Sequence, residues 1–220
     1  MSDRCVLLIG GSFDPVHQGH VALAHYFCTL LHPDELRLLP AGRPWQKPGM
    51  QTPAAHRVAM LRDAFDGWVV PVVIDEQEIL RDGASYAIDT LRALRAELGD
   101  RASIVMALGA DQLLNLPTWR DWTQLFDLAH FCFATRPGFT VTAGSLAPEV
   151  AAQLSRRLAN PAQIRSTPAG LAYIAANLSV DVSSTAIREA MAQHDRARLA
   201  GLLPAPVLDY IQRHHLYQTH

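Results

Sequence analysis

Several features are scarce in this sequence, and each scarcity excludes a class of protein. The three cysteines Cys5, Cys28 and Cys132 are widely spaced and form no CxxC pair, so we expect buried thiols rather than a disulfide framework. A formal net charge of −2 provides no basic field for nucleic acid. No apolar run approaches the roughly 20 residues of a membrane span, and the first run, 5–9, is too short for a signal peptide. We expect a cytoplasmic protein that binds neither nucleic acid nor membrane.

What is present predicts an α/β fold. Apolar residues make up 49% of the 220 residues, enough for a full core without disulfides or metals. Short apolar runs predict strands at 5–9, 35–39, 69–74, 103–108, 130–135 and 178–182. Helical spacing and start signals predict helices at 20–31, after Thr52-Pro53, from Ser85 to 98, at 149–158, from Ser184 and at 206–214.

Strands separated by helices are typical of a Rossmann-like parallel sheet flanked by helices. We expect one domain over 1–220, with a small C-terminal helical part at about 183–220. The proline-rich stretch 41–53 is expected to be a loop, and 139–171 gives no regular pattern beyond one helix.

The strongest motif is the segment 10–20, GGSFDPVHQGH, between the first expected strand and helix. Gly10 and Gly11 let the backbone approach a phosphate closely, and the helix that follows presents free N–H groups. His17 and His20 can donate hydrogen bonds to phosphate oxygens and stabilise developing charge. Alternatively they are surface residues or metal ligands, but no third ligand stands at a recognisable spacing, so we expect no protein metal site.

A second motif, VSSTAIR at 182–188, also lies where a helix is expected to start. Ser184 and Thr185 can cap that helix or bind phosphate. Arg188 follows one turn later with a guanidinium that matches phosphate oxygens. On its own, the motif is more typical of an ordinary serine-capped helix with a surface arginine, and the first motif is what favours phosphate binding.

Together the two motifs resemble the (H/T)xGH and ISSTxIR signatures of the nucleotidyltransferase superfamily, here with Val182 in place of isoleucine. Within it, the chain resembles the bacterial nicotinate-nucleotide adenylyltransferases over nearly its whole length, most weakly at about 139–175. Further matching segments are Ser85-Tyr86, GADQL at 109–113, LPTW at 116–119, Arg136-Pro137-Gly138 and the ending from Leu203-Pro204 to Leu216-Tyr217.

The resemblance implies transfer of AMP from ATP to nicotinate mononucleotide. The implied catalytic residues are His17, His20, Lys47 and Arg188. The implied ATP-binding residues are Gly10, Gly11, Ser12, Phe13, His17, Gly19, His20, Gly109, Asp111, Ser183, Ser184, Thr185 and Arg188. Asp111 would bind a ribose or another part of the nucleotide, since a carboxylate accepts hydrogen bonds from hydroxyls; it can equally be a helix N-cap, or both.

The acceptor is expected near Ser85, Tyr86, Trp119 and Arg136. An indole can stack on a pyridine ring, and N–H groups at a helix start can bind the carboxylate. Trp119 as a core residue and Arg136 as a surface arginine remain alternatives. Lys47 lies in a loop that departs from the family, because Pro44-Trp45-Gln46-Lys47 replaces the usual Pro-Pro-His-Lys and Ala41-Gly42 replaces polar residues.

The cofactor implied is Mg²⁺, carried mainly by the ATP phosphates and water. Two other acceptors, nicotinamide mononucleotide and pantetheine phosphate, stay open, although pantetheine-phosphate enzymes of the superfamily usually lack the Leu-Pro-Thr-Trp segment. A non-catalytic nucleotide-binding module is the alternative of another class, and it would be expected to lose a histidine or the arginine.

Overall fold

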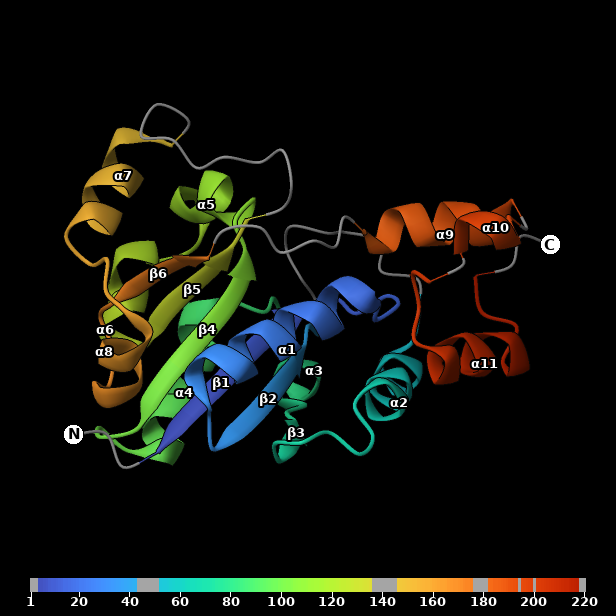
Figure 1. The fold of residues 1–220 in the computed structure, drawn as a ribbon, viewed down its shortest axis with the longest axis horizontal. Coiled ribbons are helices and arrows are strands. Elements are labelled where there is room, and N and C mark those ends of the chain that lie inside the picture. The colour runs from blue at the N-terminus through green and yellow to red at the C-terminus, as the bar shows by residue number, and fades with distance from the viewer. Residues whose placement is uncertain are drawn as a thin grey trace.

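The computed structural model describes residues 4–42, 52–135, 146–175, 182–193, 195–199 and 201–217. Its six strands form one parallel sheet in the order β3-β2-β1-β4-β5-β6, as Figure 1 shows. The strands are β1 (Cys5–Gly11), β2 (Glu35–Pro40), β3 (Val72–Ile74), β4 (Ser103–Gly109), β5 (His130–Ala134) and β6 (Ala172–Ala175). The predicted α/β fold with a parallel sheet flanked by helices is confirmed.

Helices connect the strands and continue the chain after the sheet (Figure 1). The α-helices are α1 (Gln18–Leu31), α2 (Ala54–Ala64), α3 (Gln77–Leu80), α4 (Ala87–Leu98), α5 (Gln112–Asn115), α6 (Leu125–Leu128), α7 (Pro148–Ser155), α8 (Pro161–Ser166), α9 (Ser184–Ala192), α10 (Arg196–Leu199) and α11 (Ala205–Arg213). Two 3₁₀ turns, η1 (Leu116–Thr118) and η2 (Trp122–Gln124), lie between α5 and α6. None of the described helices is long and apolar enough to cross a membrane.

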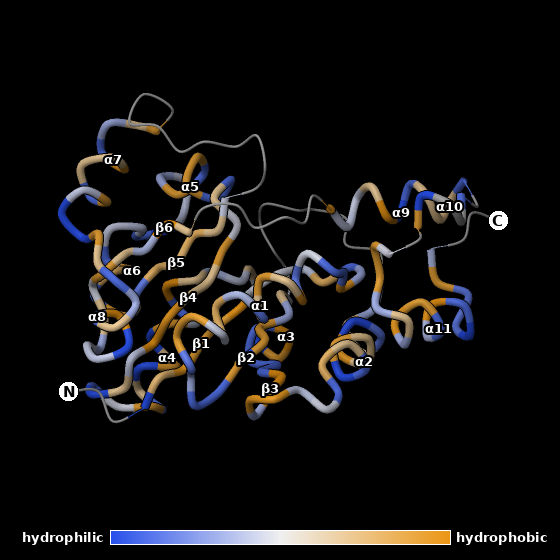
Figure 2. Tube along the Cα trace, in the orientation of Figure 1, coloured by the Kyte–Doolittle hydropathy of each residue, from blue (hydrophilic) through white to orange (hydrophobic). Residues whose placement is uncertain are grey.

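The sheet is buried on both faces because successive side chains of a strand point to opposite sides. In β1, Leu7 and Ile9 belong to the hydrophobic cluster that includes α1, α2 and α8, whereas Val6 and Leu8 belong to the cluster that includes α4, α6 and α7. β1 therefore reads as a continuous apolar run, and it is drawn largely in orange in the core of Figure 2. This double burial is why β1 was predictable from five residues of sequence.

The C-terminal helices share the core of the rest of the chain. Ile187 of α9 and Val207 and Ile211 of α11 are buried in the same cluster as Met60 and Leu61 of α2. Figure 1 shows α2, α9 and α11 gathered beside the β2–β3 edge of the sheet. The boundary that we expected near residue 183 stays a prediction, but α2 joins these helices although it comes from the middle of the sequence.

Several predicted strands and helices differ from the observed ones, mostly in where they begin or end. The strand expected at 69–74 is only β3, because Pro71 has no N–H to donate to a neighbouring strand and Val69 is 98% exposed. The helix expected at 149–158 ends at Ser155, since Leu158 instead bridges to β6. The strand expected at 178–182 lies outside the described residues except for Val182, which belongs to no strand. The sixth strand is β6, which the sequence analysis missed together with α3, α8 and α10.

Two helix starts also differ from expectation. Thr52 does not cap α2, which begins at Ala54 without a side-chain cap, and Ser85 does not cap α4, which begins at Ala87 in the same way. Each hydroxyl makes a tertiary contact instead, Thr52 with Tyr217 and Ser85 with Glu78. Partners outside each helix, one of them distant in the sequence, therefore decide the use of these hydroxyls.

Candidate active site

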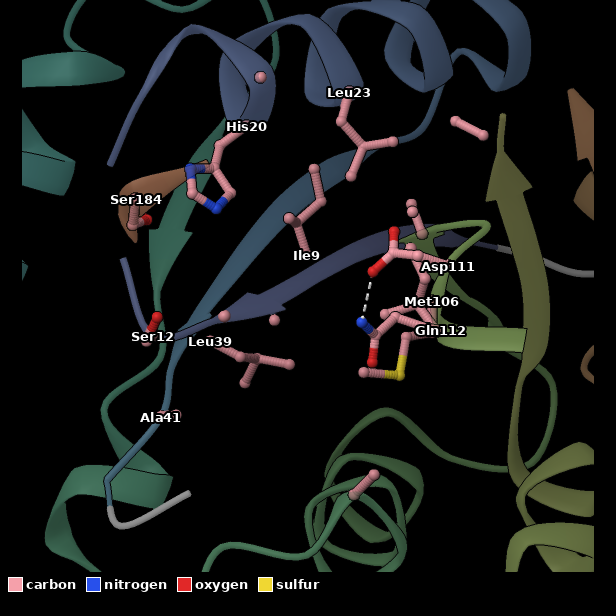
Figure 3. A pocket seen from close by; sticks show the side chains of 18 of the residues that line it. Ile9, Ser12, His20, Leu23, Leu39, Ala41, Met106, Asp111, Gln112 and Ser184 are labelled. Carbon is pink, nitrogen blue, oxygen red and sulfur yellow. Dashed lines mark hydrogen bonds between the residues drawn. The ribbon is translucent and has the colours of Figure 1, made fainter. Parts of the chain in front are cut away.

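A cavity of about 330 Å³ opens at the carboxyl ends of β1, β2, β4 and β5. It lies where the strand order reverses between β1 and β4, the position at which open parallel sheets bind ligands. Figure 3 shows its lining, with Ser12, His20 and Ser184 on one side and Met106, Asp111 and Gln112 on the other. The fold therefore brings most of the predicted site residues to one pocket.

The two histidines of the first motif stand together at the start of α1. His17 is the N-cap residue, and its backbone N–H donates to Nδ1 of His20 at 3.2 Å. This bond leaves the proton of a neutral His20 imidazole on Nε2, the nitrogen available as a donor. The two rings stack with centroids 3.7 Å apart, and both residues line the pocket. The pair is a ready set of donors for an anionic group.

Gly19 is required by close packing between the two motifs. A Cβ at Gly19 would stand 2.9 Å from Cγ1 of Val182 and 3.0 Å from the His17 ring, closer than side chains normally approach. Val182 therefore packs directly on the start of α1, and it carries Ser183 and Ser184 to the pocket. The sequence separates these motifs by more than 160 residues, and the fold places them in contact.

The second motif caps its helix differently from expectation. Ser183 caps α9 by accepting from the Ala186 N–H at 3.2 Å, so neither Ser184 nor Thr185 is the N-cap. The Ser184 hydroxyl donates instead to the Pro15 carbonyl at 3.0 Å. The start of α9 is thus tied directly to the loop of the first motif.

Three predicted ATP-binding residues do not line the cavity. Phe13 is fully buried in the core. Arg188 donates to the Asp14 carbonyl at 2.6 Å and to the Thr185 hydroxyl at 3.2 Å, so both residues lie behind the loop of the first motif. Their predicted contacts with ATP stay predictions; in this structure Arg188 supports the backbone of the loop.

Asp111 follows β4 and faces the cavity, as expected. Its Oδ2 accepts a hydrogen bond from the Gln112 side-chain amide at 2.8 Å, drawn in Figure 3. It precedes α5 as the N-cap residue, but its side chain makes no capping bond. Gly109 leaves room for the carboxylate in this position, because a Cβ there would stand 2.5 Å from Oδ1 of Asp111. The carboxylate is therefore held at the pocket by its neighbours and is not used to cap the helix.

The expected acceptor residues Ser85, Tyr86 and Trp119 line the same cavity. Trp119 is partly buried, packs against the α4 side of the core and has an Nε1 without a hydrogen-bond partner among the described residues. It is thus both a core contact and a wall of the pocket. The two readings of Trp119 that the sequence left open are compatible.

Sequence analysis missed two charged residues of the pocket. The Arg120 guanidinium lies 5.0 Å from the centre of the Tyr86 ring and 3.8 Å from the Asp89 carboxylate. It is the only lysine or arginine among the described residues that line the cavity. Its place directly after Trp119 in the LPTWR segment was the signal available in the sequence.

Glu78 of α3 is the second missed residue. Burial raises the pKa of its carboxyl group, against the opposing effect of hydrogen bonds from Thr90, at 2.8 Å, and Ser85. Its backbone also approaches the end of β2, since a Cβ at Gly42 would stand 1.9 Å from the Glu78 carbonyl oxygen. The absence of a side chain at Gly42 thus lets α3 pack closely against the chain after β2, at this end of the pocket.

Lys47 and Arg136 lie outside the described residues, so their predicted roles stay predictions. Within the described part of the chain, no group of three or more histidine, cysteine or carboxylate side chains is arranged to hold a metal ion. The pocket carboxylates Asp111 and Glu78 both accept side-chain hydrogen bonds.

Comparison with known proteins gives consistent matches. The cytidylyltransferase-like family matches residues 8–190. The chain is 57% identical to the probable nicotinate-nucleotide adenylyltransferase of Herminiimonas arsenicoxydans, over 98% of both chains. It is 43% identical to the protein of the same name from Laribacter hongkongensis, over 96% of this chain and 94% of the relative.

Solved structures share the fold. The Plasmodium falciparum nicotinic acid mononucleotide adenylyltransferase complexed with NaAD superposes with a TM-score of 0.75 and 17% identity, over 97% of both chains. The putative nicotinate-nucleotide adenylyltransferase of Vibrio parahaemolyticus gives a TM-score of 0.61 at 14% identity, over 97% of this chain and 95% of that one. At these low sequence identities, the similarity shows a shared fold and nothing further.

Proposed function

The chain belongs to the nicotinate-nucleotide adenylyltransferases of the cytidylyltransferase-like family, and we propose that its pocket joins ATP to nicotinate mononucleotide, releasing pyrophosphate. The observation that carries this proposal is the continuity of the cavity. The same cavity is lined at one end by the donors Ser12, His20 and Ser184, which suit phosphate groups, and at the other by the rings of Tyr86 and Trp119. A pyridine dinucleotide likewise combines phosphate groups with an aromatic ring.

The reaction requires positioning and charge stabilisation more than a strong base. An oxygen of the nicotinate mononucleotide phosphate attacks the α-phosphorus of ATP, the bond to the β-phosphate oxygen breaks, and pyrophosphate leaves. The attacking phosphate is already anionic near neutral pH, so no proton has to be removed from it. His17 and His20 lie at the helix start that would face the ATP phosphates, and Nε2 of His20 is the donor. Lys47 and Arg188 are the further cations of this proposal.

We propose Mg²⁺ as the cofactor, which would neutralise part of the negative charge of the ATP phosphates. The described residues fit an ion carried by the nucleotide and water, because the carboxylates of Asp111 and Glu78 both accept hydrogen bonds from neighbouring side chains. The cytoplasm is the setting we propose, from the cysteine pattern and the use of ATP. Pyrophosphate release should stop with excess chelator and return in proportion to added Mg²⁺.

The acceptor is the part of the proposal that needs a direct test. Full-length similarity to relatives named for the nicotinate substrate favours it over nicotinamide mononucleotide and pantetheine phosphate. The presence of His17, His20 and Arg188 together disfavours a non-catalytic module. Pyrophosphate release should be measured with ATP, Mg²⁺ and each acceptor in turn. Turnover with nicotinate mononucleotide is expected to exceed turnover with either of the other acceptors. Absence of turnover with all three would refute the proposed adenylyltransferase activity.

A further inference from the structure

The loop of the first motif is tied down from its outer side, away from the pocket. Nη1 of Arg57, on α2, donates to the Ser12 carbonyl at 2.8 Å. The hydroxyl of Tyr217, at the end of the described chain, donates to Oδ1 of Asp14 at 2.6 Å. We call Arg57 and Tyr217 the outer anchors. Neither lines the cavity, and the mechanism above uses neither of them.

Both anchors are charged or polar groups held in an apolar setting. Arg57 is 1% exposed and Asp14 is 3% exposed, and α2 otherwise buries only apolar side chains. Burial lowers the pKa of the Arg57 guanidinium, and the nearby Asp14 carboxylate opposes this effect. Burying such a group has a high free-energy cost unless it is compensated. An apolar side chain at this position would be buried at a lower free-energy cost, so packing alone does not explain why Arg57 is there.

The Tyr217 hydroxyl is oriented as a donor toward the loop. Burial and the hydrogen bond to Asp14 both raise the pKa of this phenol, so it stays protonated. The Thr52 hydroxyl has a smaller, opposing effect on this pKa. The Tyr217 proton is therefore directed to the Asp14 carboxylate, which can only accept it.

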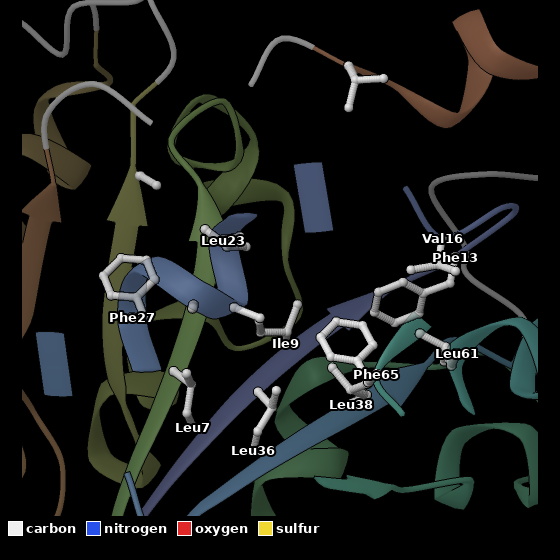
Figure 4. Close-up of a cluster of buried hydrophobic side chains, with 14 of the residues drawn as sticks. Leu7, Ile9, Phe13, Val16, Leu23, Phe27, Leu36, Leu38, Leu61 and Phe65 are labelled. Carbon is white, nitrogen blue, oxygen red and sulfur yellow. The ribbon is translucent and has the colours of Figure 1, made fainter. Parts of the chain in front are cut away.

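Phe13 connects the anchored backbone to the pocket. It lies between Ser12 and Asp14, is fully buried, and has a φ of 47°, which is uncommon for a residue with a side chain. Its ring centre lies 4.8 Å from that of His20, and its atoms lie within 3.6 Å of the place where a Cβ on Gly11 would stand. Figure 4 shows this ring beside Val16, near Leu61 and Phe65. The backbone on either side of Phe13 therefore decides where its ring meets His20.

We propose that Arg57 and Tyr217 are positioning residues for adenylyl transfer: by fixing Ser12 and Asp14 they hold Phe13 in its left-handed backbone conformation and so set the place of His20. This inference rests on the proposed function for its kinetic consequence. It also makes the turn that follows α11 part of the active-site architecture.

The test removes one hydroxyl at a time. Tyr217→Phe deletes the bond to Asp14, and Tyr210→Phe is the matched control, because Tyr210 bonds His56 at 2.9 Å between α11 and α2, away from the loop. A displacement of about 1 Å at a catalytic group can reduce the rate by up to about 100-fold. We expect kcat to fall about 10- to 100-fold in Tyr217→Phe, with little change in the KM of the acceptor, and near-normal kinetics in Tyr210→Phe.

A second readout reports on His20 without catalysis. The imidazole ¹⁵N and ¹H signals of His20, assigned by their loss in His20→Gln, should shift in Tyr217→Phe and stay in place in Tyr210→Phe. A purely structural role would lower Tm and leave these signals and kcat unchanged in the folded fraction. That result would overturn the proposal.

A second pair of variants keeps the question decidable if Tyr217→Phe does not fold. Arg57→Met should lose turnover and shift the His20 signals, and Arg57→Lys should recover part of both because it keeps a donor near Ser12. Equal kinetics and signals in Arg57→Met and the wild type would refute the inference. If the wild type itself releases no pyrophosphate, the proposed function fails, and the imidazole shifts still decide the positioning role.

Discussion

His17 and His20 are held together by two interactions, a ring stack with centroids 3.7 Å apart and a hydrogen bond from the His17 N–H to Nδ1 of His20 at 3.2 Å. The bond assigns the donor nitrogen of His20, and the stack restricts its rotation. Both rings line the pocket at the start of α1. The first prediction follows from this relationship.

His20→Ala is expected to lower kcat by about 10²- to 10³-fold, the usual effect of removing one preorganised donor to a charged transition state. The fold should be kept, because His20 lies at the helix start and not in the core. His25→Ala is the matched control, since His25 is an exposed residue of the same helix. Steady-state pyrophosphate release and thermal melts measure the two effects. Near-normal turnover in His20→Ala would remove this residue from the mechanism.

Arg120 is predicted to select the charged acceptor. Arg120→Gln should raise the KM for nicotinate mononucleotide by about 10- to 100-fold, the range for a lost hydrogen bond to a charged group. The KM for ATP should hardly change, and preference over nicotinamide mononucleotide should fall. Arg92→Gln is the control, because Arg92 also pairs with Asp89, at 3.6 Å, but does not line the cavity. Unchanged acceptor preference in Arg120→Gln would contradict this role.

Trp119 is predicted to report on the acceptor and to bind its ring. Trp119→Ala should raise the acceptor KM about 3- to 10-fold, since an aromatic pair contributes roughly 0.5–1.5 kcal/mol. Acceptor binding should change the tryptophan fluorescence of the wild type and of Trp122→Phe, but not of Trp119→Phe. Trp122 suits the comparison because it packs in the same cluster without lining the cavity. If acceptor binding still changed the fluorescence of Trp119→Phe, the pyridine ring of the acceptor would not lie against Trp119.

His130 is predicted to make stability depend on pH. Its Nε2 faces the Thr167 carbonyl at 2.8 Å, and its Nδ1 accepts from the Leu171 N–H at 3.0 Å, so the ring is buried in its neutral form. Burial lowers the pKa of this imidazole, with a smaller opposing effect from Thr167. In the unfolded chain the pKa is about 6.5. Stability is therefore complete above that pH and is lost as the pH falls toward the lowered folded value.

Urea unfolding at pH 7.5 and pH 5.5 measures this effect. His130→Asn should be less stable than the wild type at pH 7.5 by about 1–3 kcal/mol, the cost of an unsatisfied buried group. It should also lose less stability between the two pH values than the wild type does. Equal pH dependence in the two proteins would exclude His130 as the titrating group.

The elements that sequence predicted well are those whose signal is local. β1 and α1 differ from expectation by two residues at one end, because an apolar run followed by a glycine pair specifies both. β6 was missed because it has only four residues and the strand formers Tyr173 and Ile174 stand between two alanines, which is too short a signal; its pairing with β5 creates the strand. The Thr52 hydroxyl shows the same limit, since its partner Tyr217 lies far away in the sequence.

The sequence by itself determined the α/β class and the two motifs, because runs of apolar residues, glycines and helix starts act over a few residues. It also predicted many of the residues that line the cavity, and their roles toward ATP and the acceptor stay predictions. Only the tertiary structure decided that Arg188 supports the Asp14 carbonyl and that Arg120 and Glu78 reach the pocket. Only the fold brings Tyr217 to Asp14 across more than 200 residues. Such contacts depend on how strands and helices pack, and no short stretch of sequence encodes that arrangement.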